Sequence, residues 1–386
     1  MNEKEISELR RRFKPEKHNI THIRGCYVNE KREVLSLFDQ SLAVLPEEEC
    51  EKYLALLKRS LSGALGKNLV DIAFSTQQVV DSEEHRLLMA LRDSELRDEA
   101  AAQAFFQKAV AEIQMEGNYL ILLAADTYDV PYRSTDGARQ ADASSEVFRY
   151  LVCGVCPVKP TKPALSYAAA QNEFHSRRAD WIVAPPELGF LFPAFDERAA
   201  NLYGALYYTK DTSALQDGFL DAVFHTDPPM PADEQKETFQ EILRETLDDE
   251  CRFDVVQAVH DDVAERIEAH KLNKEVEPLL LSKREVRDVL ESCGVSGAHL
   301  DRFDARYDEA FGPDQALPPK NLVDGKKFTV RAGDVLVQVN AERSDLIETR
   351  VIDGRRYILI SAEGDVEVNG ISIRIADAQT ETAAAT

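Results

Sequence analysis

Residues 148–156 read FRYLVCGVC, and four more apolar runs follow before residue 210: ALSYAAA at 164–170, WIV at 181–183, LGFLFPAF at 188–195 and NLYGALYY at 201–208. Each run is too short for a helix and rich in small apolar or aromatic residues, and clusters of Pro separate several of them. This pattern is typical of successive buried strands. We therefore expect the stretch 145–210 to form the central sheet of the protein.

The sequence before this stretch alternates between helix and strand patterns. Apolar residues at helical spacing predict helices over 2–13, from Pro46 to Leu61, from Asp81 to Leu91 and over 97–115. Strand patterns occupy 23–29, 32–39, 68–74 and 119–125. The last of these is apolar on both faces, as expected for a central strand covered on each side. The polar segment from Asp126 to Ser144 is predicted to be a mobile loop.

Beyond residue 231 the pattern changes twice. Helical spacing predicts helices over 232–248, 253–271, 282–293 and 297–311, the third of which begins with a capping box at Ser282 and Glu285. From Asn321, strand patterns alternate with the turn signals Asp324-Gly325, Asp353-Gly354 and Asn369-Gly370, which predict a small meander or barrel.

The expected fold class is therefore α+β. We predict an N-terminal mixed α/β region with a central sheet (1–230), a helical segment (231–316), a small C-terminal all-β module (317–377) and a disordered tail (378–386).

The charge of the chain excludes some classes of partner. Its 386 residues carry a formal net charge of −23, so duplex DNA and anionic membranes are not expected as partners. No apolar run approaches the roughly 20 residues of a membrane-spanning helix, and the N-terminal MNEKEISELRRRF lacks the apolar core of a signal peptide. The six cysteines are then expected to be reduced thiols. These features predict an acidic, cytoplasmic protein.

The pair Cys153 and Cys156 forms a CxxC motif. A redox pair needs its first thiol near a helix N-terminus, whereas here an apolar strand precedes the pair and Pro157 follows it. In a strand, residues three apart point to opposite faces, so the two sulfurs are expected to diverge. A zinc site would need a second pair of ligands, and Cys251 and Cys293 are isolated. We expect two buried core residues, and no metal ligands are predicted.

A basic cluster near the N-terminus is the candidate ligand site. Between Met1 and Arg32 the sequence has nine Lys and Arg against five Asp and Glu. Guanidinium groups and nearby imidazoles can hold a phosphate, a nucleotide or an RNA loop. The competing interpretation is a solvated helix face that pairs with the protein's own carboxylates. The residues of this cluster are Arg10, Arg11, Arg12, Lys14, Lys17, His18, His22 and Arg24.

No arrangement in the sequence identifies a catalytic mechanism. His175 with Asp180, and His225 with Asp227, have the composition of a general base and its orienting carboxylate, but neither has a nucleophile at a recognised spacing. Asp126 and Asp129 follow a predicted central strand, which is the usual place for active-site residues of α/β proteins. The chain contains no GxGxxG, HExxH or GxSxG motif and no Walker A loop. Catalytic residues and cofactors therefore stay unassigned.

Taken as a whole, the sequence resembles a known family. The resemblance lies in EISELRRRFKPEKHNITHIRGCYVNEK (5–31), DIAFSTQQVVDSEEHRLLMALRDSEL (71–96), ELGFLFPAFDER (187–198), MPADEQKETFQ (230–240), QAVHDDV (257–263) and NAERSDLIETRVIDGRRYILI (340–360). These segments are similar to the bacterial domain-of-unknown-function family numbered four-three-one-seven, of anaerobic Gram-positive bacteria, over nearly all of residues 1–377. The resemblance implies a bacterial cytosolic protein of one architecture, and it carries no activity, cofactor or catalytic residue.

Two functions are compatible with these observations. The first is a non-catalytic binding or assembly protein, favoured by the missing catalytic motifs, the acidic composition and the appended β module. The second is an enzyme or sensor that acts on a phosphorylated or nucleotide ligand through the N-terminal basic cluster. The partner, whether a protein or a small molecule, is not identified by the sequence.

Overall fold

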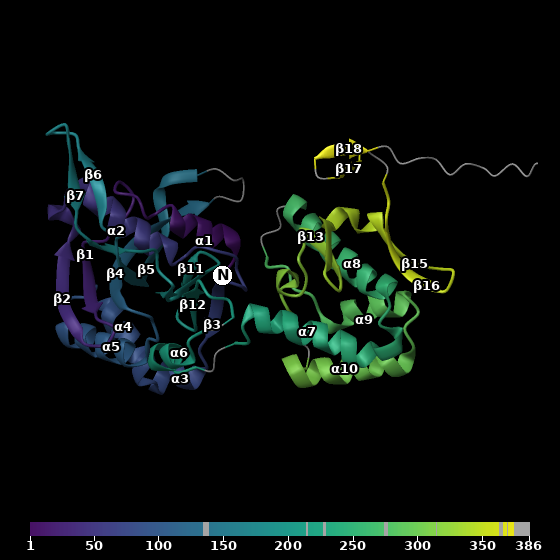
Figure 1. Cartoon of the computed structure of the whole chain (residues 1–386). Coiled ribbons are helices and arrows are strands. Elements are labelled where there is room, and N and C mark those ends of the chain that lie inside the picture. Colours follow the sequence, from purple (N-terminus) through teal and green to yellow (C-terminus); the bar gives the residue numbers. More distant parts are fainter. Residues whose placement is uncertain are drawn as a thin grey trace, which may run out of the picture. The chain divides into compact units, whose positions relative to one another are not determined.

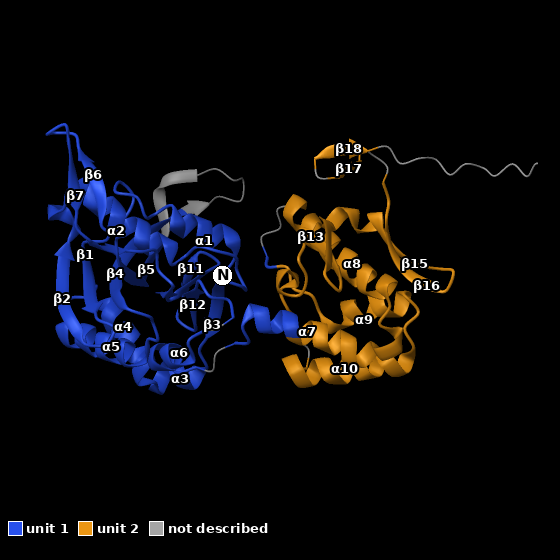
Figure 2. Cartoon of the chain, viewed as in Figure 1, with its two compact units in different colours: residues 1–237, 275–278 blue, residues 238–274, 279–386 orange. Residues whose placement is uncertain are grey.

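A computed structural model describes residues 1–133, 139–213, 215–226, 229–273, 277–313, 315–362, 366–368 and 370–373. It contains helices and strands in both halves of the chain and confirms the α+β fold class (Figure 1). The chain divides into two compact units, residues 1–237 with 275–278 and residues 238–274 with 279–386 (Figure 2). The three-domain division predicted from the sequence stays a prediction, and the predicted tail lies outside the described residues.

The first unit is built on an eight-stranded antiparallel sheet. The strand order is β2-β1-β4-β5-β9-β12-β3, and β8 pairs with the end of β5. The strands of this sheet are β1 (His22–Val28), β2 (Val34–Ser41), β3 (Leu69–Ala73), β4 (Asn118–Arg133), β5 (Arg139–Pro160), β8 (Trp181–Val183), β9 (Leu188–Phe192) and β12 (Gly204–Thr209). Two separate hairpins pair β6 (Ala164–Ala168) with β7 (Glu173–Arg177) and β10 (Ala194–Asp196) with β11 (Ala199–Asn201).

Helices cover both faces of this sheet (Figure 1). One face packs against the apolar sides of α1 (Glu3–Arg10) and α2 (Glu47–Arg59), and a 3-10 turn, η1 (Leu42–Val44), precedes α2. The other face packs against α4 (Glu83–Asp93), α5 (Glu99–Glu112) and α6 (Asp217–Phe224), with the short α3 (Thr76–Asp81) beside α4. The result is a three-layer arrangement with two apolar cores.

The residues of strand β4 show that the sheet is buried on both faces. Leu120, Leu122 and Ala124 face the core under α1 and α2. Tyr119, Ile121 and Leu123 alternate with them and face the core under α4, α5 and α6. A strand between two helical layers must be apolar at every position, because successive side chains point to opposite faces. The central position predicted for residues 119–125 is confirmed.

Two parts of the first unit differ from the prediction. Residues 164–170 and 181–183 were expected to be buried strands, but β8 is exposed throughout and β6 is exposed except at the half-buried Ala168. The segment after Asp126 was expected to be a loop, but β4 continues to Arg133 and β5 begins at Arg139. Pairing across the long β4–β5 ribbon supplies backbone hydrogen bonds that a single-segment pattern does not reveal. Residues 134–138 lie outside the described chain.

The second unit contains a helical core. Its main helices are α7 (Ala232–Leu247), α8 (Phe253–Asn273), α9 (Lys283–Ser292) and α10 (Gly297–Phe311), and its 3-10 turns are η2 (Asp248–Glu250), η3 (Pro319–Asn321) and η4 (Ala341–Leu346). The core holds Phe239, Val259, Leu290 and Phe303, one from each of the four helices. Ser282 caps α9, and Glu285 returns the hydrogen bond, as the capping box predicted.

The C-terminal strands form separate hairpins within the described residues, not the predicted meander or barrel. They pair β13 (Lys327–Ala332) with β14 (Val335–Asn340), β15 (Ile347–Ile352) with β16 (Arg355–Ile360), and β17 (Val366–Val368) with β18 (Ile371–Ile373). Asp353-Gly354 joins β15 to β16 as predicted, whereas Asp324-Gly325 precedes β13, and the turn between β13 and β14 is Gly333-Asp334. A turn signal specifies a local hairpin, but it does not determine which strand lies beside the next hairpin. Phe328 of β13 instead packs against His260 of α8, with ring centroids 4.9 Å apart.

Candidate functional site

An arm projects from the first unit where β5 ends (Figure 1). We define the arm as residues 159–183, which contain the hairpin β6–β7 and the strand β8. Pro160 and Pro163 lack backbone N–H groups, so β5 does not continue as a ladder strand. At the base of the arm, the Thr161 backbone N–H donates to the Asp180 carbonyl at 2.7 Å, and the Asp180 N–H donates to Thr161 Oγ1 at 2.9 Å.

The hairpin of the arm has one apolar face and one polar face. Tyr167 lies opposite Phe174, and Leu165 lies two residues from Tyr167 on the same face. The two aromatic rings contact each other, with centroids 5.2 Å apart. The opposite face carries Ser166, paired with His175, and other small or polar residues. Leu165 is 71% exposed and Phe174 is 67% exposed, so the apolar face is uncovered.

The base of the arm adds a second exposed apolar group. Trp181, the single Trp of the chain, is 58% exposed, and its neighbours Ile182 and Val183 are also exposed. The arm therefore exposes apolar side chains both on its hairpin and at its base. A contiguous exposed apolar patch on a protein marks an interaction surface more often than isolated exposed residues do.

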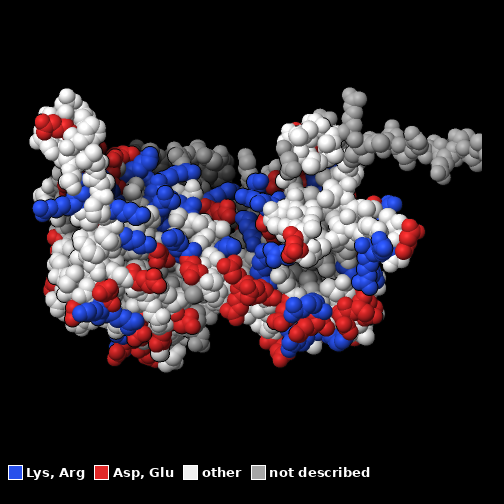
Figure 3. Space-filling model, viewed as in Figure 1, with Lys and Arg blue, Asp and Glu red and all other residues white. Residues whose placement is uncertain are grey.

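The arm is also basic in a strongly acidic protein. It has four cationic side chains, Lys159, Lys162, Arg177 and Arg178, against Glu173 and Asp180. Within the described chain, none of these four cations has a side-chain ion pair or hydrogen bond, and all four are exposed. Figure 3 shows the arm as a column of largely uncharged surface, with Lys and Arg atoms gathered around its foot.

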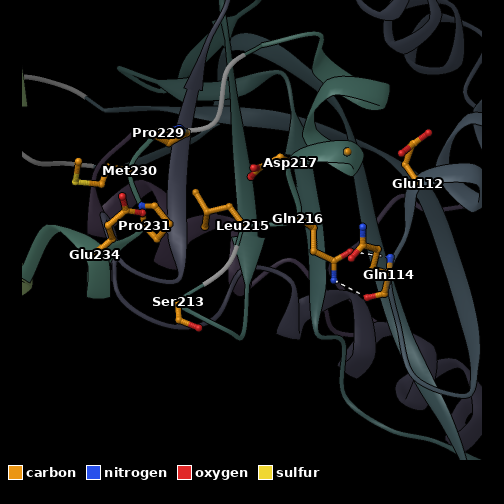
Figure 4. A pocket seen from close by; sticks show the side chains of 11 residues that line it. Glu112, Gln114, Ser213, Leu215, Gln216, Asp217, Pro229, Met230, Pro231 and Glu234 are labelled. Atoms are coloured by element: carbon orange, nitrogen blue, oxygen red, sulfur yellow. Dashed lines mark hydrogen bonds between the residues drawn. The ribbon is translucent and has the colours of Figure 1, made fainter. Parts of the chain in front are cut away.

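A groove of about 630 Å³ lies in the same unit, between the end of α5 and the beginnings of α6 and α7 (Figure 4). Its carboxylates are Glu112, Asp217 and Glu234, all exposed and without an ion pair in the described chain. Its apolar lining comes from Leu215, Pro229, Met230 and Pro231. We call it the acidic groove.

Two glutamines hold one wall of the acidic groove. The Gln114 backbone N–H donates to Gln216 Oε1 at 3.1 Å, and Gln216 Nε2 donates to the Gln114 carbonyl at 3.0 Å (Figure 4). These bonds keep Gln216 in a left-handed conformation with φ of 54°. A Cβ on Gly218 would lie 2.7 Å from Glu112 Oε2, so a larger residue there would displace that carboxylate.

The structure does not gather the predicted basic cluster at one site. Arg10 donates to the backbone carbonyls of Leu61 and Gly63. His22 and Arg24 lie beside Asp39, at 3.0 and 3.6 Å, and Arg24 also pairs with Glu99. The side chains of Arg11, Lys14 and Lys17 are exposed and make no ion pair within the described chain.

Arg12 of this cluster is part of a buried polar network around Asp126. Its Nε and Nη2 donate to the two Asp126 carboxylate oxygens, both at 3.0 Å. The Asn19 backbone N–H and the Tyr150 hydroxyl donate to the same carboxylate at 2.7 Å each. Burial, together with the Asp126 charge, raises the pKa of Tyr150 well above its usual value, so the hydroxyl stays a donor. Asp126 therefore has a complete set of partners and fastens the N-terminal segment to the sheet.

His18 lies at the edge of this network. Its Nδ1 accepts a hydrogen bond from the Ile20 backbone N–H at 3.1 Å, and its Nε2 lies 3.9 Å from Cys50 Sγ. Burial lowers the pKa of His18 below its usual value. Burial also raises the pKa of the Cys50 thiol, so this pair lacks the thiolate that nucleophilic or redox chemistry requires.

The two cysteines of the CxxC motif are core residues on opposite faces of the sheet, as predicted. Cys153 belongs to the core under α4, α5 and α6, and Cys156 to the core under α1 and α2. Burial raises the pKa of Cys156 to about 12. The glycine between them also has a structural reason, because a Cβ on Gly154 would lie 2.7 Å from the Ser60 hydroxyl at the end of α2.

His175 and His225 each lie beside a carboxylate other than the one predicted from the sequence. His175 lies on the polar face of the arm, 3.7 Å from Glu173. His225 pairs with Asp221 at 3.1 Å, and Asp227 lies outside the described residues. Among the described residues, no three His, Cys, Asp or Glu side chains are grouped as metal ligands, and no helix is both long and apolar enough to cross a membrane.

The arm and the acidic groove were not predicted as sites. The signal for the arm was present, because Leu165 and Tyr167 alternate with the small residues Ala164, Ser166 and Ala168, whereas 119–125 is apolar throughout. Alternation indicates a strand with one covered and one open face. The groove had no such signal, because it joins the end of α5 to a segment about 100 positions later, as Gln114 and Gln216 are 102 positions apart.

A comparison with known families gives one match. The model of a family described as Domain of unknown function (DUF4317) matches residues 1–371. No curated protein matches the chain.

Proposed function

We propose that this chain, which belongs to the family described as Domain of unknown function (DUF4317), is a non-catalytic binding or assembly protein that docks onto a protein partner through its arm. The observation that carries the proposal is the exposure of the apolar side chains of the arm, which are Leu165, Tyr167 and Phe174 on the hairpin and Trp181 at its base. The bacterial, cytoplasmic setting predicted from the sequence is part of the proposal.

The energetics of the arm support docking. Burying an exposed apolar side chain contributes about 1.5–3 kcal/mol, so several such residues on one hairpin offset part of the cost of association. Trp, Tyr and Arg are the residues that most often dominate binding energy in protein interfaces. The arm presents all three types, at Trp181, Tyr167 and Arg177.

The partner is expected to be a protein with an apolar cleft and an acidic rim. The apolar face of the hairpin needs an apolar surface, and the four unpaired cations need carboxylates to replace the water they lose. A single-stranded RNA would also meet aromatic and basic groups, but the net charge of −23 opposes a polyanion over the rest of the surface.

The test compares two variants of the full chain as bait in native bacterial extract. In Tyr167→Ser/Phe174→Ser the apolar face of the arm is lost, whereas His175→Ser changes the polar face of the same hairpin. We expect the wild type and His175→Ser to capture the same protein and the double variant to lose it. Equal capture by all three chains would contradict a role for the arm.

The alternative is an enzyme or sensor for a phosphorylated or nucleotide ligand, and fewer of the predicted residues are left to bind such a ligand. Arg10, Arg12, His22 and Arg24 already have protein partners, which leaves the exposed side chains of Arg11, Lys14 and Lys17 for a phosphate. A thermal-shift titration with phosphate and nucleotides tests it, since a ligand at 100 times its Kd adds about 2.7 kcal/mol of stability.

A further inference from the structure

Resting on the proposed function, we infer that the arm's partner is a second copy of this chain, and that the arm of one copy inserts into the acidic groove of the next. The acidic groove has the chemistry expected of the partner, with an apolar lining and unpaired carboxylates at its rim. Both elements belong to the first unit, so each copy offers one arm and one groove.

The charges of the two elements are complementary. Lys159, Lys162, Arg177 and Arg178 of the arm have no ion pair within the described chain, and neither do Glu112, Asp217 and Glu234 of the groove. By contrast, Arg266 and Arg287 of the second unit each pair with two carboxylates. Docking would pair both sets at once, which gives orientation and specificity to the contact.

The apolar surfaces are complementary as well. Leu215, Met230 and the two prolines Pro229 and Pro231 line the groove, and its volume of about 630 Å³ lies within the range of about 300–1,000 Å³ that encloses small ligands. The aromatic side chains of Tyr167 and Phe174 near the tip of the hairpin are the groups that would fill it. Gln216 and Gln114 already hold one wall in place by reciprocal hydrogen bonds.

The arm does not serve its own groove. In Figure 1, β6 and β7 rise on the side of the sheet that α2 covers, whereas α5 and α6 lie on the other side. The hairpin is short, with strands of about 17 Å, and it is fixed at its base by the bonds between Thr161 and Asp180. An arm and a groove that are different surfaces give a head-to-tail contact, which builds rings or filaments.

The experiment uses sedimentation velocity on the full chain at low salt. The wild type is expected to form species larger than a monomer that grow with concentration. The arm variant Tyr167→Ser/Phe174→Ser and the groove variant Glu112→Lys/Glu234→Lys are each expected to be monomeric. Their mixture is expected to form a dimer and nothing larger, because it contains one intact arm and one intact groove. Dimer formation also shows that both variants are folded.

The controls match the variants in position and charge. His175→Ser alters the polar face of the same hairpin, and Glu83→Lys/Glu116→Lys changes two exposed carboxylates of the same unit outside the groove. Both are expected to assemble as the wild type does. The single Trp181 gives a second readout, since its emission is expected to shift to shorter wavelength on assembly and to stay unshifted in the two defective variants.

Three outcomes would overturn the inference. A wild-type chain that stays monomeric up to about 100 µM, which is a hundredfold above a micromolar Kd, has no such contact. If that monomer still captures a different protein through its arm, the second-copy inference fails and the proposed function stands. If it binds a single-stranded oligonucleotide instead, both the second-copy inference and the proposed function fail. If the two defective variants do not dimerise when mixed while the wild type assembles, the contact uses other surfaces.

Discussion

The N-terminal basic segment and the arm are both rich in Lys and Arg, yet the structure uses them differently. In the N-terminal segment, Arg12 makes two hydrogen bonds to the buried Asp126, and Arg24 pairs with Glu99 and Asp39. In the arm, Arg177 and Arg178 have no such partner within the described chain, and the arm also carries exposed aromatic side chains. The paired arginines of the N-terminal segment hold the fold together, and the cations of the arm are available to another molecule.

This difference shows that a run of charges is informative only once its partners are known. A paired, desolvated arginine contributes to the fold, and its removal leaves a buried carboxylate behind. An unpaired arginine on an exposed strand contributes little to stability. The two regions should therefore respond in opposite ways to substitution, with one changing the free energy of unfolding and the other changing association.

The largest effect is expected at Asp126. Replacing Asp126 by Ala leaves the Arg12 guanidinium and the Tyr150 hydroxyl without their acceptor in a buried position, so the free energy of unfolding should fall by about 3–5 kcal/mol. Urea unfolding followed by circular dichroism measures the change. Asp39→Ala is the control, because Asp39 is 42% exposed, and its loss should cost no more than about 1 kcal/mol. Equal losses for the two variants would show that the buried network has no special role.

The second effect is expected in the arm, on association. Tyr167→Ser/Phe174→Ser removes two aromatic side chains that would each contribute about 1.5–3 kcal/mol when buried, so the partner contact should weaken by at least about 100-fold. The free energy of unfolding should change by no more than about 0.5 kcal/mol, because both rings are exposed. Sedimentation and urea unfolding of the same variant measure both quantities. A large loss of stability would mean that the arm is part of the core.

The salt concentration should affect association through the arm more than the stability of the N-terminal segment. Raising NaCl from about 0.05 M to about 0.5 M shortens the screening length severalfold, so association through the exposed cations of the arm should weaken by about tenfold. The pair between Arg12 and Asp126 is buried and should be affected little. Sedimentation and thermal unfolding across the salt series test this. Association that is insensitive to salt would show that the cations of the arm do not take part.

A smaller, pH-dependent effect is expected at His18. Its pKa in the folded chain is lowered by burial, so the unfolded chain binds the proton more tightly. The stability that depends on neutral His18 is complete above the unfolded pKa of about 6.5 and is lost as the pH falls through the lower folded pKa. His18→Gln should flatten the decline of stability between about pH 7 and pH 5, where the carboxylates contribute less. An unchanged slope in urea unfolding would assign the decline to other groups.

The smallest effect is expected at Arg11 and Lys14. Both side chains are exposed and without an ion pair in the described chain, so Arg11→Ala/Lys14→Ala should change the free energy of unfolding by no more than about 0.5 kcal/mol. The same variant tests the phosphate hypothesis. A thermal shift with phosphate that disappears in this variant would favour a ligand site in the N-terminal segment over the view that its charges are structural.

Much of the fold follows from local patterns. The helices of the second unit follow from the helical spacing of their apolar residues, and strand β4 follows from its continuous apolar sequence. In both cases the residues of the element itself show which of its faces are buried. The opposite faces of Cys153 and Cys156 follow from strand geometry alone. The exposed β6 and β8 were mistaken for buried strands, because a short apolar run has the same composition in a core and on a binding surface.

The arm and the acidic groove were harder to predict from the sequence. Alternation in residues 164–177 gives an amphipathic hairpin, but nothing in the segment says whether the chain itself covers the apolar face. The acidic groove brings together residues around 112, 217 and 234, and only the packing of α5, α6 and α7 places them side by side. The joining of Arg12 to Asp126 is of the same kind, because 114 positions separate the two residues along the chain.

The sequence by itself determined the α+β class, the acidic charge, most helices and the two-sided burial of β4, because these depend on spacing and composition within one segment. Only the tertiary structure decided which cations are paired, which apolar strands are uncovered and which carboxylates line the groove. Those properties depend on what lies beside a residue in space, and a contact between two distant segments leaves no periodic pattern in the sequence of either segment.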